Sequence, residues 1–248
     1  IGDQLGLFKE LTRGGPATSE ELAGRMDLSE RYAREWLSCL ACAGYLEYRA
    51  EDGRFLLPPE HAVFLEQEGG PRFVGGTLQR MPLSWRAIEV VEQAFRTGEG
   101  VPMDTYGPGI AEATERGTAT WHDHKLIQQW IPAVPEVQAM LERGVSVADV
   151  GSGSGRALIR LAEAFPKSSY VGFDVFEPAV ERATVNASVS GVADRVRFER
   201  RDINVGLPDS FDVITTFDVI HDLPHPRETL AEIRKALKPG GAYLMLEI

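Results

Sequence analysis

The fold of this 248-residue chain is decided by residues 145–162, which read VSVADVGSGSGRALIRLA. The first six residues are rich in β-branched side chains and predict a strand, the next five alternate glycine with serine, and the last seven have helical periodicity. A strand, a tight glycine turn and a helix N-terminus form the first unit of a doubly wound α/β sheet. The open N–H groups at such a helix start favour an anionic or hydroxyl-rich ligand.

The spacing of the glycines limits the kind of ligand. Gly151, Gly153 and Gly155 give Gly-x-Gly-x-Gly, whereas a dinucleotide-binding turn has Gly-x-Gly-x-x-Gly and would need glycine in place of Arg156. We interpret the glycines as positions where a side chain would keep the backbone from a ligand, or where the backbone needs positive φ. An NAD-dependent oxidoreductase is therefore a disfavoured alternative.

Two later segments strengthen the case for a nucleoside site. Residues 170–174, YVGFD, predict a second strand that ends in a carboxylate, about twenty residues after the turn. There Asp174 can accept hydrogen bonds from both hydroxyls of a ribose. Residues 237–241, LKPGG, end a helix and turn into a strand that we expect over residues 242–248.

Taken in order, these motifs resemble those of class I S-adenosylmethionine-dependent methyltransferases over residues 145–248. The resemblance implies a Rossmann-like, doubly wound, mostly parallel sheet and S-adenosyl-L-methionine as cofactor. It places the methionine part over the glycine turn, the ribose on Asp174 and the adenine near Asp202 and Ile203. No metal is expected. The residues expected at the cofactor are Asp149, Gly151, Ser152, Gly153, Gly155, Asp174, Val175, Asp202, Ile203 and Phe217.

The candidate for catalysis follows the predicted fourth strand, residues 210–218. Residues 220–222, IHD, come next, at the carboxyl edge where open α/β sheets bind ligands. They resemble the His-Asp of plant-type and polyketide O-methyltransferases, which implies that His221 is a general base; an imidazole suits this role because its pKa lies near neutrality. Those enzymes continue with Trp and an acid, whereas this chain has Leu223 and Pro224. The alternative is that His221 only hydrogen-bonds its loop or packs on the cofactor.

Bulk composition excludes several classes of function. A hydrophobic content of 43% can fill real cores, and the length fits one large or two ordinary domains. The net charge of −11 argues against nucleic acid as the main partner. No apolar run reaches membrane-spanning length and no signal-peptide pattern opens the chain, so we expect a cytoplasmic protein without a membrane partner.

Residues 1–70 predict a winged helix-turn-helix domain. A short amphipathic helix is followed by two helices opened by Thr18 and Ser29, and then by a β-hairpin within residues 46–57. A DNA-reading module would gather basic side chains on the third helix and the wing, but the chain up to Glu68 has seven basic and thirteen acidic residues. We therefore expect a dimerisation domain that helps to wall the pocket, as in the small-molecule O-methyltransferases that this layout resembles. A transcription regulator that senses S-adenosylmethionine is the alternative.

Two motifs that suggest metal or redox chemistry are interpreted differently. Cys39 and Cys42 have no second ligand pair, so we expect small, buried core residues. His122 and His124 lie two positions apart and so face different sides of a helix. We expect them on the surface or at a pocket rim.

The sequence thus predicts three parts: a winged-helix domain over residues 1–70, a helical connector and substrate-side wall over 71–144, and the cofactor domain over 145–248. The predicted function is methylation of a small molecule, most simply of a hydroxyl group, by a homodimer. The chain begins at Ile1 and ends one strand after the LKPGG turn, whereas such sheets continue with an antiparallel hairpin. An open apolar edge strand is an aggregation hazard, so we expect a fragment of a longer protein.

Overall fold

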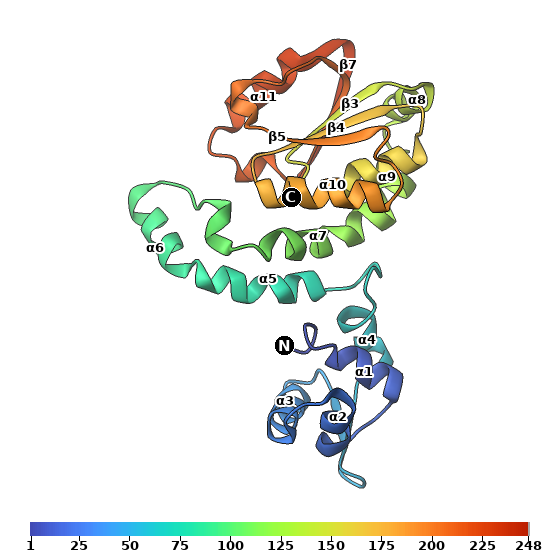
Figure 1. The fold of residues 1–248 in the computed structure, drawn as a ribbon, viewed down its shortest axis with the longest axis vertical. Coiled ribbons are helices and arrows are strands. Elements are labelled where there is room, and N and C mark those ends of the chain that lie inside the picture. Colours follow the sequence, from blue (N-terminus) through green and yellow to red (C-terminus); the bar gives the residue numbers. More distant parts are fainter. Residues whose placement is uncertain (248) are drawn as a thin grey trace. The chain divides into compact units, whose positions relative to one another are not determined.

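The structure is a computed structural model that describes residues 1–247 (Figure 1). Its contacts divide the chain into two compact units, one that ends at Pro82 and one that starts at Leu83. Among the described residues, no helix is long and apolar enough to cross a membrane. The three-part division of the sequence stays a prediction.

The first unit is a winged helix-turn-helix domain. Its elements are α1 (Leu7–Gly14), α2 (Ser19–Met26), α3 (Glu30–Cys42), the antiparallel strands β1 (Glu47–Arg49) and β2 (Arg54–Leu56), and α4 (Pro59–Leu65). Helix α2 begins with a capping box, in which the Thr18 hydroxyl accepts from the N–H of Glu21 and the Glu21 carboxylate accepts from the N–H of Thr18. The predicted order of three helices and a hairpin is confirmed.

The prediction of buried cysteines is wrong. Cys39 and Cys42 are both free and exposed. Helix α3 is amphipathic and buries a single stripe that includes Ala33 and Leu37, with Leu40 partly buried against the same core. The cysteines fall outside this stripe, because their spacing from Leu37 turns them away from the core.

Helical segments precede the sheet along the chain. They are α5 (Gly75–Arg86), α6 (Ile88–Thr97), the 3-10 helix η1 (Met103–Tyr106), α7 (Ile110–Trp121), the π-helix η2 (His122–Trp130) and α8 (Pro135–Arg143). The helix expected to carry His122 and His124 is present, but it is the π-helix η2, which follows α7 directly. Such segments are rare and are frequently found at functional sites.

Within residues 1–247, five parallel strands form the sheet of the second unit, in the order β5-β4-β3-β6-β7. The strands are β3 (Ser146–Val150), β4 (Ser169–Asp174), β5 (Val196–Arg200), β6 (Phe211–Phe217) and β7 (Leu237–Leu246). The connecting helices are α9 (Arg156–Ala164), α10 (Glu177–Val189) and α11 (Pro226–Ala236). The strand order reverses between β3 and β6, and ligands of such sheets bind outside the carboxyl ends at this switch point. The predicted α/β fold is confirmed.

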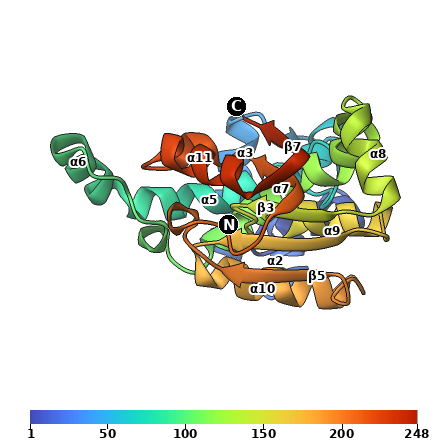
Figure 2. The same cartoon turned by 90° about the horizontal axis from the view of Figure 1, so that it is seen from above.

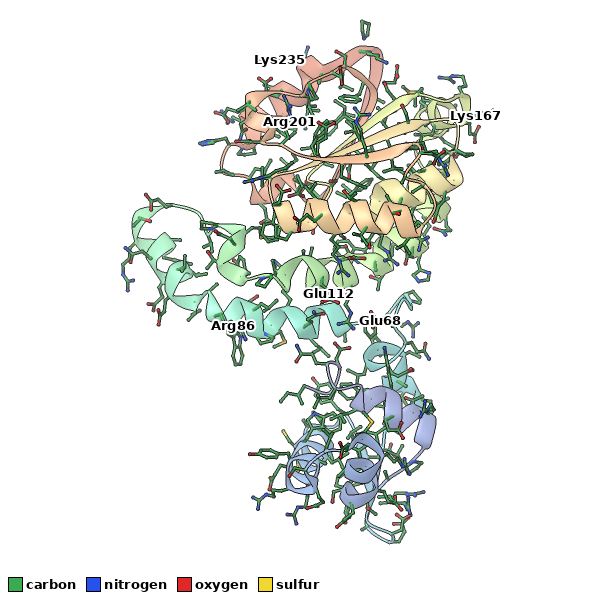
Figure 3. All side chains as sticks on the ribbon, viewed as in Figure 1. Glu68, Arg86, Glu112, Lys167, Arg201 and Lys235 are labelled. Atoms are coloured by element: carbon green, nitrogen blue, oxygen red, sulfur yellow. The ribbon has the colours of Figure 1, made fainter. Side chains whose placement is uncertain are left out.

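The sheet carries hydrophobic clusters on both faces. Val147 and Tyr170 belong to a cluster with residues of α9 and α10, whereas their chain neighbours Ala148 and Val171 belong to a cluster with residues of α11. This alternation follows from the two-residue period of a strand. Figure 2 accordingly shows α10 and α11 on opposite sides of the sheet, and Figure 3 shows the side chains that fill the space between.

Strand β7 begins earlier than predicted. Its pairing with β6 starts at Leu237, passes an irregularity, and continues from Ala242 to Leu246. Between these stretches Lys238 donates to Oδ2 of Asp212 at 2.8 Å and to Oγ of Ser146 at 2.9 Å, which fixes the start of β7 to β6 and β3. The last residue of the predicted strand, Ile248, lies outside the described residues.

Candidate active site

The glycine turn follows β3 at the carboxyl edge of the sheet. Gly151, Gly153 and Gly155 have φ values of +70°, +52° and +79°, a region that disfavours side chains. A Cβ on Gly155 would lie 2.3 Å from the ring of Phe198, and one on Gly151 would lie 2.5 Å from Val219, so both glycines also permit close packing. A Cβ on Gly153 would meet nothing within 4 Å, so only this glycine faces open space.

Asp174 faces this turn from the end of β4. Its Oδ2 accepts from the N–H of Gly153 at 2.8 Å, and its Oδ1 accepts from the N–H of Phe176 at 2.9 Å. Burial raises the pKa of Asp174, while the backbone hydrogen bonds of Phe176 and Gly153 oppose this. Each carboxylate oxygen keeps a second lone pair that can accept a ribose hydroxyl. An open glycine beside a fixed carboxylate fits a nucleoside cofactor.

Asp149 lies below the turn, inside the sheet. The residue is buried, and its Oδ1 accepts from Oγ1 of Thr215 at 2.6 Å, which ties β3 to β6. Burial raises the pKa of Asp149 to about 7, and the nearby Asp174 charge contributes to the increase. Its contacts with described residues support the turn, and its predicted role at the cofactor stays a prediction.

The remaining predicted cofactor residues follow neighbouring strands at the same edge. Ser152 is buried, and its Oγ has no hydrogen-bond partner among residues 1–247. Val175 is exposed directly after β4. Asp202 is exposed and caps the 3-10 helix η3 (Ile203–Val205), in which Ile203 is buried in the cluster beneath.

His221 lies in the 3-10 helix η4 (Ile220–Asp222) after β6, and 34% of its side chain is exposed. Its Nδ1 lies 2.5 Å from Oε2 of Glu247, which follows β7. The other oxygen of Glu247 accepts from the N–H groups of Val219 and Ile220 at 3.2 and 2.8 Å. The contact with Glu247 raises the pKa of His221. Burial opposes ionisation of Glu247, but the hydrogen bonds from His221 and the backbone lower its pKa overall.

These contacts define the tautomer of the neutral ring. An ionised Glu247 can only accept, so Nδ1 of His221 carries the proton and Nε2 carries the lone pair. Sequence reasoning missed Glu247. Its signal was a carboxylate at the end of the strand predicted over residues 242–248, because parallel strands that lie side by side bring their carboxyl ends together.

Asp218 adds a second carboxylate to this site. It has φ +63°, and its buried Oδ1 lies 3.7 Å from Nδ1 of His221 without a hydrogen-bond partner in the described chain. Ligand atoms of Asp218, His221 and Glu247 all lie within 4.8 Å of one another, a spacing that a metal ion could also use. The direct contact of Glu247 with Nδ1 already occupies that side of the ring.

The π-helix brings His122 to the end of β6. Its ring meets that of Phe217 edge-on, with 5.6 Å between centroids, and Trp130 stacks on the same Phe217 at 6.4 Å. The sequence predicts His122 on the surface or at a pocket rim. The surface position is wrong, because its ring packs inward on Phe217 and the residue is 8% exposed, and the pocket-rim position stays a prediction. Burial lowers the pKa of His122 to about 4, so the ring is neutral at physiological pH.

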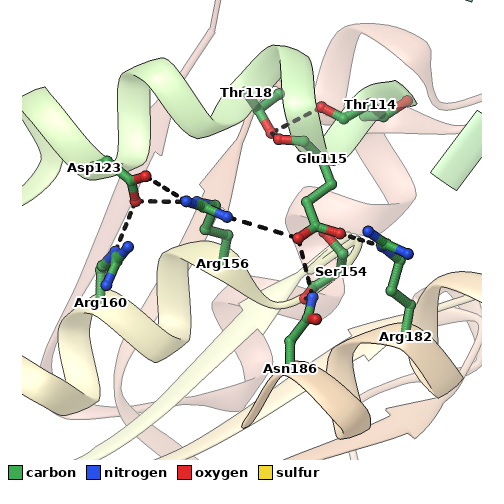
Figure 4. A network of polar contacts seen from close by, with 9 residues as sticks. All are labelled: Thr114, Glu115, Thr118, Asp123, Ser154, Arg156, Arg160, Arg182 and Asn186. Carbon is green, nitrogen blue, oxygen red and sulfur yellow. Dashed lines mark hydrogen bonds and ion pairs between the residues drawn. The ribbon is translucent and has the colours of Figure 1, made fainter. Parts of the chain in front are cut away.

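A polar network joins α7 and the π-helix to the helices after β3 and β4 (Figure 4). Its charged and amide members are Glu115, Asp123, Arg156, Arg160, Arg182 and Asn186. Asp123 accepts from Arg156 and Arg160 at the start of α9. The amide of Asn186 donates to Glu115 and to the carbonyl oxygen of Ser154, so the network reaches the glycine turn itself.

Comparison with known families identifies the domains. Residues 141–248 match the family described as a methyltransferase domain, and residues 1–67 match the Rv2258c-like winged HTH domain. The chain carries a methyltransferase domain. With its parallel five-stranded sheet, the protein is an S-adenosylmethionine-dependent methyltransferase with an N-terminal winged helix-turn-helix domain. This result favours the methyltransferase over the NAD-dependent alternative.

Individual relatives agree with this assignment. The N,N-dimethyltransferase OxyT of Streptomyces rimosus is 29% identical over 99% of this chain and 72% of its own length. The 27-O-demethylrifamycin SV methyltransferase of Amycolatopsis mediterranei is 35% identical over 41% of this chain, and the match covers 38% of that protein.

Solved structures share the fold of the methyltransferase at low sequence identity. The mitomycin 7-O-methyltransferase MmcR has a TM-score of 0.74 and 24% identity, over 98% of this chain and 73% of that one. Human N-acetylserotonin methyltransferase has a TM-score of 0.73 and 18% identity, with the same coverage. At such identities the likeness shows the fold alone.

Proposed function

We propose that the methyltransferase transfers a methyl group to a hydroxyl oxygen of a small molecule, with His221 as general base. The observation that carries this proposal is the contact of His221 with Glu247, which leaves the Nε2 lone pair of a partly exposed imidazole at the carboxyl end of β6. A hydroxyl must lose its proton to become a strong nucleophile, so an oriented base is most useful for an oxygen acceptor.

S-adenosylmethionine held at the turn would supply an electrophilic methyl group on a sulfonium, with S-adenosylhomocysteine as the leaving group. In the proposed mechanism, Nε2 of His221 takes the proton of the acceptor hydroxyl, which makes that oxygen a stronger nucleophile. The carboxylate of Glu247 stabilises the resulting imidazolium through Nδ1. Asp174 holds the ribose and the turn at Gly153 leaves room for the methionyl part, so that positioning contributes much of the rate.

Methylation of an amine is a second candidate, because OxyT is an N,N-dimethyltransferase and aligns with 99% of this chain. An amine attacks through its own lone pair, and its proton can leave after the transfer. A base is therefore less critical for nitrogen than for oxygen. The dependence of each reaction on His221 separates the two candidates.

The test uses pairs of phenols and anilines of matched shape, with release of S-adenosylhomocysteine as the readout. We expect turnover of phenols and a loss of roughly 10²–10⁴-fold in their turnover for His221→Ala. His225 is an exposed histidine before α11, and the variant His225→Ala is the matched control, which should keep wild-type rates. Turnover of anilines alone, or phenol turnover that His221→Ala leaves unchanged, would contradict the proposal.

We also propose that the winged-helix domain forms a homodimer rather than a DNA complex. The arginines of α3 are paired with acids of the same helix, Arg31 with Glu35 and Arg34 with Glu30. Tyr32 of the same helix is an exposed aromatic side chain, which is typical of an interface. Light scattering should give a dimer for the wild type and a monomer for Tyr32→Glu. Val189→Glu, an exposed site on α10, serves as the control, and a gel shift with DNA should show no complex. The cytoplasmic location stays a prediction.

A further inference from the structure

The buried imidazole of His122 lacks the hydrogen bonds that such a group needs. Neither Nδ1 nor Nε2 has a partner among residues 1–247, although both atoms are buried. A neutral imidazole carries one N–H donor and one acceptor nitrogen, and buried polar groups are normally paired. The ring of His122 therefore needs one hydrogen-bond donor and one acceptor, and residues 1–247 supply neither.

The charged groups around His122 are already engaged. Asp123, the next residue, accepts from Arg156 and Arg160, and Arg156 also pairs with Glu115 (Figure 4). These contacts fix the start of the π-helix against the first turns of α9. The structure thus holds His122 in place through its neighbour and leaves its own ring nitrogens for another group.

Two contacts locate the ring of His122 relative to the carboxyl edge of the sheet, where the glycine turn lies. Phe217, which the ring touches, ends β6, and Arg156, which holds Asp123, begins α9 directly after Gly155. Strand β3 lies between β4 and β6, so the end of β6 and the start of α9 flank the glycine turn. In the proposed placement Asp174 takes the ribose on the β4 side. The part of the cofactor that remains for the β6 side of the turn is its methionyl end.

We propose that His122 binds the methionyl end of the cofactor, by donating to its carboxylate and accepting from its ammonium group through the two ring nitrogens, directly or through one bound water. This inference rests on the proposed placement of S-adenosylmethionine over the turn. The methionyl end presents one acceptor group and one donor group, as the neutral imidazole requires. A neutral ring also avoids repulsion of the positively charged sulfonium.

The experiment compares two probes that differ only at the methionyl end. S-adenosylhomocysteine carries the amino acid group, and 5′-methylthioadenosine lacks it. The variant His122→Phe keeps an aromatic ring against Phe217 but has no hydrogen-bonding nitrogens. In calorimetry it should bind S-adenosylhomocysteine about ten- to a hundredfold more weakly than the wild type does, which is the effect expected for the loss of hydrogen bonds to charged groups. Binding of 5′-methylthioadenosine should be unchanged.

Further variants separate this role from a structural one. His122→Asn keeps a donor and an acceptor and should recover part of the affinity, while His124→Phe on the same π-helix should bind both probes like the wild type. Equal affinity of His122→Phe and wild type for S-adenosylhomocysteine would overturn the proposal, and so would an equal loss for both probes. If the wild type itself bound neither probe, the proposed cofactor placement would fail instead. If His122→Phe did not fold, the His122→Asn measurement would decide.

Discussion

Nδ1 of His221 lies 2.5 Å from Oε2 of Glu247, although the two residues are 26 positions apart in the chain. Strands β6 and β7 pair in parallel up to Phe217 and Leu246, so the residues just beyond both strands meet at one edge. Glu247 therefore orients both the imidazole and the backbone of the loop that carries it.

The pair predicts a pH dependence of methyl transfer. The base must be neutral to accept a proton, and Glu247 raises the pKa of His221 above its usual 6.5. We expect kcat/KM to rise with pH, with a midpoint above 6.5. Glu247→Gln removes the charge and should move this midpoint down towards 6.5. A pH profile on a single acceptor checks this, with Glu232→Gln on α11 as the control. An unchanged midpoint in Glu247→Gln would count against the assignment.

We expect substitution of Asp174 to lower the affinity for the cofactor and to leave the protein folded. Asp174→Asn keeps the size of the side chain but removes the negatively charged carboxylate. In the wild type this carboxylate accepts from the N–H of Gly153 and, as proposed, from the ribose. We expect S-adenosylhomocysteine to bind roughly ten- to a hundredfold more weakly by calorimetry. Asp209→Asn, an exposed site, should bind normally. Wild-type affinity in Asp174→Asn would refute the ribose contact.

Alanine substitutions at two glycines of the turn, Gly153 and Gly155, should have different effects on stability and on cofactor affinity. Alanine at Gly155 would press its Cβ against Phe198, so Gly155→Ala should lower the free energy of unfolding by about 2–4 kcal/mol, from overpacking and from the positive φ together. Alanine at Gly153 meets open space and should cost only about 1 kcal/mol, from its backbone angle. Gly153→Ala should instead lose cofactor affinity. Urea unfolding and calorimetry on both variants measure the contrast, which equal stability losses would contradict.

We expect the contribution of Asp212 to the free energy of unfolding to depend on pH. Burial opposes its ionisation, but hydrogen bonds from Lys238 and Ser146 lower the pKa of Asp212 to about 2. A carboxylate with a depressed pKa stabilises the fold above its unfolded value near 3.8, and this contribution is lost as pH falls towards 2. Asp212→Asn should therefore lower the free energy of unfolding by about 1–2 kcal/mol at pH 7. Urea titrations at pH 7 and pH 3 should show the difference shrinking in acid; a constant difference would exclude this origin.

The cluster of Asp218, His221 and Glu247 predicts how metals act on the enzyme. A zinc ion on Nδ1 of His221 would displace Glu247 and leave the proton on Nε2, so the ring could no longer act as a base. We expect chelation by EDTA to leave turnover unchanged and added zinc to inhibit it. Glu247→Gln should weaken the inhibition. Loss of turnover on chelation would show that the cluster works as a metal site.

The sequence predicted the parts of the site that are local. The glycine turn, Asp174 at the end of the next strand and the His-Asp after β6 each follow from a short pattern, because a strand and its following turn depend mainly on their own residues. The same holds for the winged-helix order, which Thr18 and the hairpin residues signal. Local patterns likewise predicted the parallel sheet.

Only the tertiary structure decided which of these groups meet. The partner of His221 is Glu247 because two strands pair in parallel, and Asp218 joins them through a backbone angle that no periodicity reveals. His122 turns inward on Phe217, which its spacing from His124 did not reveal, while Cys39 and Cys42 lie outside the stripe that α3 buries. The physical reason is common to all of these cases: burial and hydrogen bonding depend on residues distant in the chain, whereas a sequence pattern reports only the element in which a residue sits.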